Sequence, residues 1–88
     1  MVSSTQQNVA QALEEIVRRF APKNRAAIAL HPETHLTDEA GIDSPRMIDI
    51  VLGVEDRFGI TVEDDDVQSV KTFGQLVELV SRYQEEAA

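Results

Sequence analysis

The sequence predicts an all-α fold, a small four-helix bundle with three longer helices, one short helix and a long first loop. Apolar residues recur at the three- and four-residue spacing of amphipathic helices in three separate segments. No segment alternates apolar and polar residues for long enough to predict a strand. The 88 residues suffice for one small domain, so we expect a single unit over residues 1–88 with an ordered core over about residues 5–84.

We expect the first helix over residues 5–20, where apolar residues follow helical spacing. Ser4 and Gln7 fit a capping box at its start, and Pro22 discourages its continuation. The long connection over residues 21–43 follows. Within it, residues 26–30 could form one turn of helix before Pro32. The buried stripe of the first helix is expected to comprise Val9, Leu13, Ile16, Val17 and Phe20.

The second helix begins sharply, because Ser44 is a capping residue type directly before Pro45, which suits the first helical position. It should end near Phe58, with Gly59 just beyond it. Its apolar residues cover an arc of about 200°. That arc predicts neighbours on two sides, or a cavity against one of them. The residues of the arc are Met47, Ile48, Ile50, Val51, Leu52, Val54 and Phe58.

The remaining helices are a short one and a long one. The acidic residues 63–66 resemble the first turn of a short helix that ends near Ser69. Thr72 and Gln75 form a capping box at the start of the last helix. The apolar stripe of the last helix is Phe73, Leu76, Val77, Val80 and Tyr83.

Charge and composition exclude several classes of function. Sixteen acidic residues against eight basic ones give a formal net charge of −8, which disfavours nucleic acid and anionic membranes and favours partners with basic patches. No apolar run approaches the ~20 residues of a membrane span. The polar start lacks the features of a signal peptide, so the cytoplasm is the expected compartment. We expect a monomer.

Catalytic and metal sites are poorly supported. The chain has no Cys, which excludes a cysteine nucleophile, and no Gly-x-Ser-x-Gly elbow surrounds a serine. His31 and His35 would share a metal ion only in a helix, and Pro32 argues against one. Residues 63–66 lack the ligand pattern of a calcium loop. We therefore expect no metal site and no enzyme activity.

The segment Gly41-Ile42-Asp43-Ser44 before the second helix, and the segment Glu55 to Ile60 at its end, are similar to motifs of the acyl carrier proteins. The resemblance extends from about Val9 to Tyr83. It implies that Ser44 carries 4′-phosphopantetheine through a phosphodiester, and that Asp43 helps a phosphopantetheinyl transferase engage the site. The thiol of that arm would hold acyl groups as thioesters for acyl-transferring and acyl-modifying enzymes of fatty-acid, polyketide or specialised lipid pathways.

The resemblance also assigns a partner face and a cargo site. Enzymes with basic docking patches are expected to contact Pro45, Arg46, Asp49, Glu55 and Asp56. Ile48, Val51 and Leu52 are expected to line an acyl-chain pocket with Leu76 and Val80. The family usually has Leu where Pro45 stands and no cation where Arg46 stands. These departures favour a specialised carrier that serves few partners.

Two alternatives remain open. Peptidyl carriers usually show Gly-Gly-His/Asp-Ser, whereas Ile42 precedes Asp43 here, but an aminoacyl or peptidyl cargo is not excluded. The other alternative is an unmodified acidic helical adaptor that binds a basic protein, in which Ser44 is only an N-cap.

Overall fold

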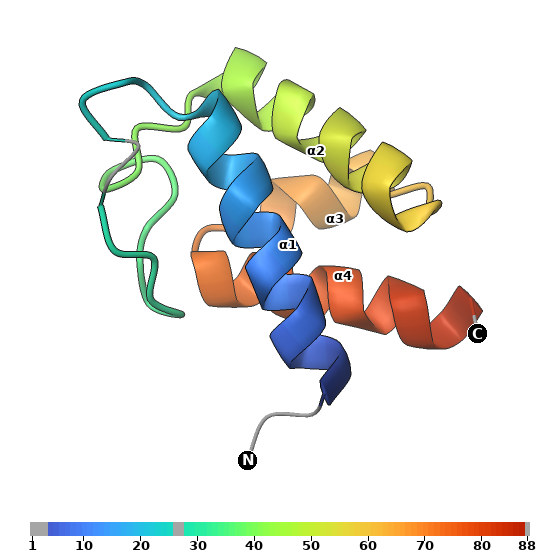
Figure 1. Cartoon of the computed structure of the whole chain (residues 1–88). Coiled ribbons are helices and arrows are strands. Elements are labelled where there is room, and N and C mark those ends of the chain that lie inside the picture. The colour runs from blue at the N-terminus through green and yellow to red at the C-terminus, as the bar shows by residue number, and fades with distance from the viewer. Residues whose placement is uncertain (1–3, 26–27, 88) are drawn as a thin grey trace.

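The computed structural model describes residues 4–25 and 28–87, with side chains from residue 7 to residue 86 outside the gap. It contains four helices in the predicted order, α1 (Ser4–Phe20), α2 (Ser44–Phe58), α3 (Asp64–Ser69) and α4 (Phe73–Ala87) (Figure 1). The part of the chain that is described contains no strand, and its one isolated β-bridge joins His35 to Thr72. The predicted all-α class is confirmed.

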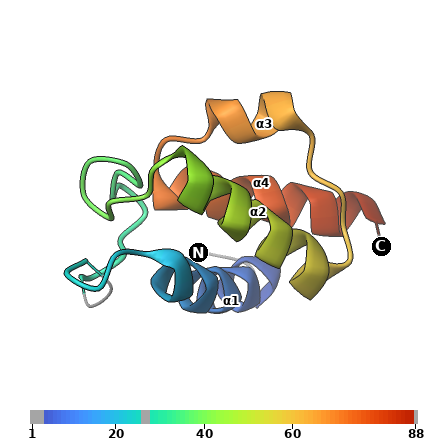
Figure 2. The ribbon, with the colours of Figure 1, turned by 90° about the horizontal axis from the view of Figure 1, so that it is seen from above.

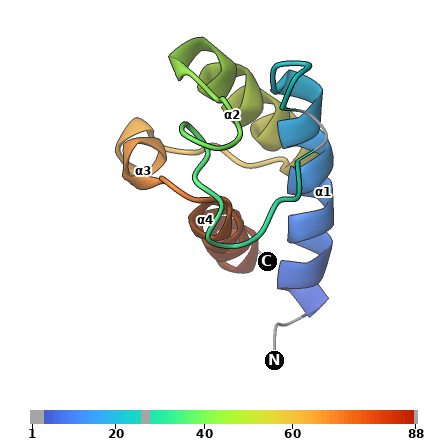
Figure 3. The ribbon, with the colours of Figure 1, turned by 90° about the vertical axis from the view of Figure 1, so that its left-hand side faces the viewer.

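The four helices differ in how they pack. α1 packs against both α2 and α4. α3 lies on the opposite side of the molecule from α1, with α2 and α4 between them, as Figures 2 and 3 show from two directions. α3 contributes no buried residue. α1, α2 and α4 therefore supply the buried helical residues, and α3 completes the four-helix bundle with Val67 packed against the core.

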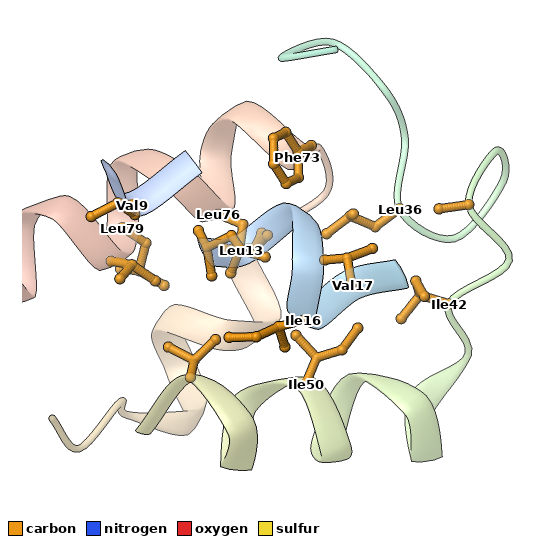
Figure 4. Packing of buried hydrophobic residues seen from close by; sticks show 14 of the residues in the cluster. Val9, Leu13, Ile16, Val17, Leu36, Ile42, Ile50, Phe73, Leu76 and Leu79 are labelled. Carbon is orange, nitrogen blue, oxygen red and sulfur yellow. The ribbon is translucent and has the colours of Figure 1, made fainter. Parts of the chain in front are cut away.

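The core lies where α1, α2 and α4 meet. Leu13 of α1, Ile50 of α2 and Val80 of α4 are fully buried, and Leu36 and Ile42 reach the same cluster from the long connection (Figure 4). The expected apolar stripes of α1 and α4 mostly face this core. Four of the five α1 residues are buried, and Phe20 is half-buried.

Backbone hydrogen bonds hold the long connection against the start of α4. The N–H of Leu36 donates to the carbonyl of Lys71 at 2.9 Å, and the N–H of Gly74 donates to the carbonyl of Pro32 at 2.8 Å. A Cβ at Gly74 would lie 2.7 Å from that Pro32 oxygen, so only glycine permits this approach. Ile42, 1% exposed, anchors the end of the connection in the core. These contacts fix the position of Ser44, the residue that begins α2.

Two helix ends agree with the sequence, and the cap at the start of α1 lies outside the described residues. Gly59 ends α2 in the left-handed conformation, with φ 67°. Gln75 and Thr72 form the expected capping box, with bonds of 3.1 and 3.2 Å. The side chain of Ser4, and with it the first capping box, lies outside the described residues, as do residues 26 and 27. Residues 28–30 are not helical.

Candidate functional site

The start of α2 is set by Asp43, not by Ser44. Asp43 has extended backbone dihedrals, and its Oδ1 accepts the N–H of Arg46 at 3.0 Å. Ser44 is the first helical residue and Pro45 the second. The expectation that Ser44 caps the helix is therefore wrong. Both residue types are good caps, but here the carboxylate takes that position. The Ser44 side chain is exposed, and its hydroxyl has no hydrogen-bond partner among the described residues.

Arg46 binds both carboxylate oxygens of Asp43. Its backbone N–H binds Oδ1, and its Nη1 lies 2.7 Å from Oδ2. The two side chains are 38% and 54% exposed, which makes this an ion pair at the protein surface. The sequence assigned Arg46 to the partner face and did not predict its pairing with Asp43. The three-residue spacing that joins it to Asp43 was the available signal, because residues i and i+3 share a helix face.

A groove runs from Ser44 along the exposed side of α2 toward α3. Its apolar lining includes Ile48 and Leu52, which are 60% and 58% exposed and are the large apolar side chains most exposed to solvent in the described chain. The wide apolar arc of α2 therefore has a neighbour on one side and an open groove on the other. The groove is lined by Thr37, Ile42, Asp43, Ser44, Met47, Ile48, Val51, Leu52, Glu55, Val62, Asp64, Val67, Gln68, Val70 and Lys71.

Beneath the groove is a small interior cavity between α2, α3 and α4. Of the residues expected to contact the cargo, Val51, Leu76 and Val80 line this cavity, whereas Ile48 and Leu52 line only the outer groove. The cavity has a volume of about 10 Å³, which is close to the minimum for one water molecule. An acyl chain would therefore have to separate the helices before it could enter.

The expected partner residues have different surroundings. Asp49 and Asp56 are exposed on α2. Glu55 is half-buried, and its Oε2 accepts the N–H of Val62 at 2.9 Å. Glu55 thus ties α2 to the segment that leads into α3. Val62 lies beyond the end of α2, so the spacing of residues along a helix gave no signal for this bond.

Tyr83 forms a second tie to α3. Its hydroxyl donates to Oδ2 of Asp66 at 2.6 Å and accepts the N–H of Glu63 at 3.2 Å. The hydrogen bond to the Asp66 carboxylate is the main cause that raises the pKa of Tyr83 above its ordinary 10.0. The sequence placed Tyr83 in the apolar stripe of the last helix and gave no indication of this polar role.

In the described ranges, no group of three His, Asp or Glu side chains is arranged to hold a metal ion. His31 and His35 lie outside any helix, and Nδ1 of His35 accepts the N–H of Asp38 at 3.3 Å. None of the helices in the described residues is long and apolar enough to cross a membrane.

Comparison with known protein families identifies the kind of site that this is. Residues 11–80 match the family model of the phosphopantetheine attachment site. That segment includes Ser44, both ends of α2 and most of α4. The chain therefore belongs to the phosphopantetheine attachment family.

Curated relatives narrow the assignment. An acyl carrier protein of Myxococcus xanthus is 31% identical over 77 residues, which cover 88% of this chain and 95% of the relative. An acyl carrier protein of Acidothermus cellulolyticus is 29% identical and covers 88% of this chain and 89% of the relative. A meromycolate extension acyl carrier protein of Mycolicibacterium smegmatis is 27% identical, covering 97% and 84%. The chain is thus one of the acyl carrier proteins of that family.

A solved structure has the same fold. The hexanoyl acyl carrier protein from the actinorhodin polyketide synthase of Streptomyces coelicolor superposes with a TM-score of 0.74 at 22% identity, over 86% of this chain and 90% of that one. The cofactor of the family is 4′-phosphopantetheine. The site described above fits such a group, because it offers an exposed, unbonded hydroxyl at the mouth of an open groove.

Proposed function

We propose that Ser44 is the attachment residue for 4′-phosphopantetheine and that the protein carries acyl groups between enzymes. One observation carries this proposal: the Ser44 hydroxyl is exposed and unbonded at the first position of α2, because Asp43 has taken the capping role. A nucleophilic oxygen in that position is open to a modifying enzyme. When bound, the arm supplies a thiol that holds acyl groups as thioesters.

The protein positions the phosphopantetheine arm and supplies no reacting group of its own. It has no Cys, so the only thiol of the carrier would be that of the arm. Asp43 fixes the backbone turn that exposes Ser44 and also faces the approaching phosphopantetheinyl transferase. No arrangement of nucleophile and base is needed for this role, and we infer that the protein is not an enzyme.

The cargo site is proposed to have an inner and an outer part. Val51, Leu76 and Val80 help to line the interior cavity, and Ile48 and Leu52 line the groove above it. A bound chain would lie first on the outer residues and would enter the interior only if α3 moved outward. α3 is suited to such movement, since it buries none of its own residues.

The proposed partners are acyl-transferring and acyl-modifying enzymes with basic docking patches. Asp49 and Asp56 are the exposed acids of α2 that would meet those patches, and Pro45 lies beside the attachment residue. Such exposed charges chiefly tune association rate and discrimination. We infer a monomeric carrier in the cytoplasm that serves a specialised pathway.

Intact-mass measurement tests the attachment. The protein is incubated with coenzyme A and a phosphopantetheinyl transferase, and we expect it to gain the mass of one phosphopantetheine. Ser44→Ala should gain none, while Ser69→Ala, whose serine is also exposed, serves as the matched control and should load fully. Loading of Ser44→Ala would refute the assignment. No loading of the wild type would favour an unmodified adaptor.

A further inference from the structure

Arg46 is the cation nearest to Ser44 in the sequence, and both its backbone and its side chain are bound to Asp43. Its backbone N–H forms the cap bond with Asp43, and its guanidinium holds the other oxygen of the same carboxylate at 2.7 Å. The side chain is 38% exposed. A guanidinium has five N–H donors, and this pair uses one of them. The others have no acceptor among the described residues.

A phosphodiester on Ser44 would create a charge conflict at this point. It carries a negative charge one residue away from the Asp43 carboxylate, which is itself negative. Like charges at such short range oppose each other unless a cation lies between them. In the first turn of α2, Arg46 is the only residue that can supply that charge.

The backbone of α2 offers the phosphate little compensation. The start of a helix normally presents several free N–H groups to an anion. Here Pro45 has none, the N–H of Arg46 is held by Asp43, and the N–H of Met47 donates to the Asp43 carbonyl at 2.9 Å. Among these first positions, only the N–H of Ser44 lacks an acceptor in the described residues.

We propose that Arg46 positions the phosphodiester carried by Ser44. One edge of its guanidinium stays on Asp43 while another donates to a phosphate oxygen, so that a single cation balances two neighbouring anions. Planar guanidinium groups suit such two-sided binding, and lysine does not. This inference rests on the proposed function. It also means that Arg46 is not an unpaired cation presented to partner enzymes.

A comparison of unloaded and loaded protein tests the proposal. The melting temperature is measured for both forms of the wild type, Arg46→Ala and Arg57→Ala. Arg57 is the matched control, because it is an exposed arginine at the far end of the same helix. The cap bond uses the backbone N–H of residue 46, so it survives in Arg46→Ala. Taking the difference between loaded and unloaded forms cancels what each substitution does to the unloaded fold.

We expect loading to lower the melting temperature of Arg46→Ala by about 2–5 °C more than that of the wild type or Arg57→Ala. Asp43→Asn in the Arg46→Ala background removes one of the two anions and should abolish this excess. High salt should reduce it as well. As a second readout, the ³¹P resonance of the loaded protein should shift in Arg46→Ala and not in Arg57→Ala.

The outcomes separate this proposal from the proposed function. If the protein loads but the effect of loading is equal in Arg46→Ala and Arg57→Ala, and the ³¹P resonance is unchanged, Arg46 does not position the phosphate. If Ser44 is never loaded, the proposed function fails and the Arg46 inference fails with it. Full rescue by Arg46→Lys would show that charge alone is needed and would overturn the two-sided binding.

Discussion

Asp43 and Ser44 are adjacent in the chain but have different roles at the start of α2. The Asp43 carboxylate satisfies the first-turn N–H of Arg46 and pairs with the arginine side chain. That leaves the Ser44 hydroxyl unbonded and exposed. If Ser44 were the cap instead, its oxygen would be engaged in the helix and less available for modification. Because Asp43 caps the helix, the Ser44 hydroxyl remains available for modification.

Substitutions at these two residues should therefore affect stability differently. We expect Asp43→Ala to lower the free energy of unfolding by about 0.5–2 kcal/mol, because it removes the cap. Ser44→Ala should change it by less than about 0.5 kcal/mol, since no bond is lost. Asp43→Asn keeps a good capping side chain and loses only the ion pair, so it should fall between them. Urea denaturation measures all three, and a larger loss in Ser44→Ala than in Asp43→Ala would contradict the assignment of the cap.

The sequence located this site but not its internal geometry. Gly41-Ile42-Asp43-Ser44 before an apolar helix indicated the attachment position. Asp and Ser are nearly equal in capping preference, and Pro is accepted at either of the first two helical positions, so the sequence could not decide which residue caps. The pairing of Asp43 with Arg46 depends on that choice and was missed for the same reason.

At the scale of elements, α3 is held by hydrogen bonds from its neighbours as well as by the partly buried Val67. None of its residues is buried. The Tyr83 hydroxyl holds Asp66, and the Glu55 carboxylate holds the backbone of Val62 just before the helix. The existence of α3 followed from its acidic first turn. The sequence did not predict these bonds, because each joins a residue of one helix to a residue outside that helix.

Loss of the tyrosine tie should loosen α3 locally. In Tyr83→Phe the aromatic ring remains and the bonds to Asp66 and Glu63 are lost. We expect faster hydrogen exchange in α3 with little change in α1, and a lower free energy of unfolding. Asp65→Ala is the matched control, because Asp65 is an exposed neighbour in the same turn and forms no hydrogen bond to α4 within the described residues. Equal exchange in both variants would show that Tyr83 does not hold α3.

The titration of Tyr83 reports the same bond. Its pKa is raised above 10.0, chiefly by the hydrogen bond to Asp66. In the unfolded chain the group has its ordinary pKa, so the folded chain retains the proton to higher pH. The stabilisation is therefore fully present below about pH 10 and is lost as pH rises through the folded pKa.

Absorbance measures this titration directly, because Tyr83 is the only Tyr and the chain has no Trp. We expect the midpoint of the native protein to lie above 10.0 and to return to about 10 in urea. Asp66→Asn should lower the native midpoint, since it removes the carboxylate charge. A native midpoint at or below the one in urea would contradict the bond.

At the scale of the whole molecule, helical periodicity predicted the bundle because α1, α2 and α4 each bury one regular stripe in a shared core. The groove along α2 was harder to predict. A sequence shows that Ile48 and Leu52 are apolar, but not whether a neighbouring element covers them. α3 is only six residues long, and Ile48 and Leu52 remain more than half exposed. The difference between a buried side and an open groove is thus a property of the assembled fold.

The net charge of −8 should make stability depend on ionic strength. The Debye length falls from about 30 Å at 0.01 M to about 8 Å at 0.15 M salt, so added NaCl should screen the repulsion and raise the melting temperature. Glu85 and Glu86 are exposed in the last turn of α4, where the helix dipole disfavours acids. Replacing both by Gln reduces the net charge to −6 and should raise the melting temperature most at low salt.

Asp64 and Asp65 provide the matched comparison. They are exposed acids in the first turn of α3, where the helix dipole favours negative charge. Replacing both by Asn gives the same change in net charge, but it also removes that favourable interaction, so the gain in melting temperature should be smaller. If the two pairs of substitutions give equal gains, net charge alone sets the salt dependence. If neither pair changes the melting temperature at 0.01 M salt, repulsion among the acidic residues is too weak to limit the stability of this fold.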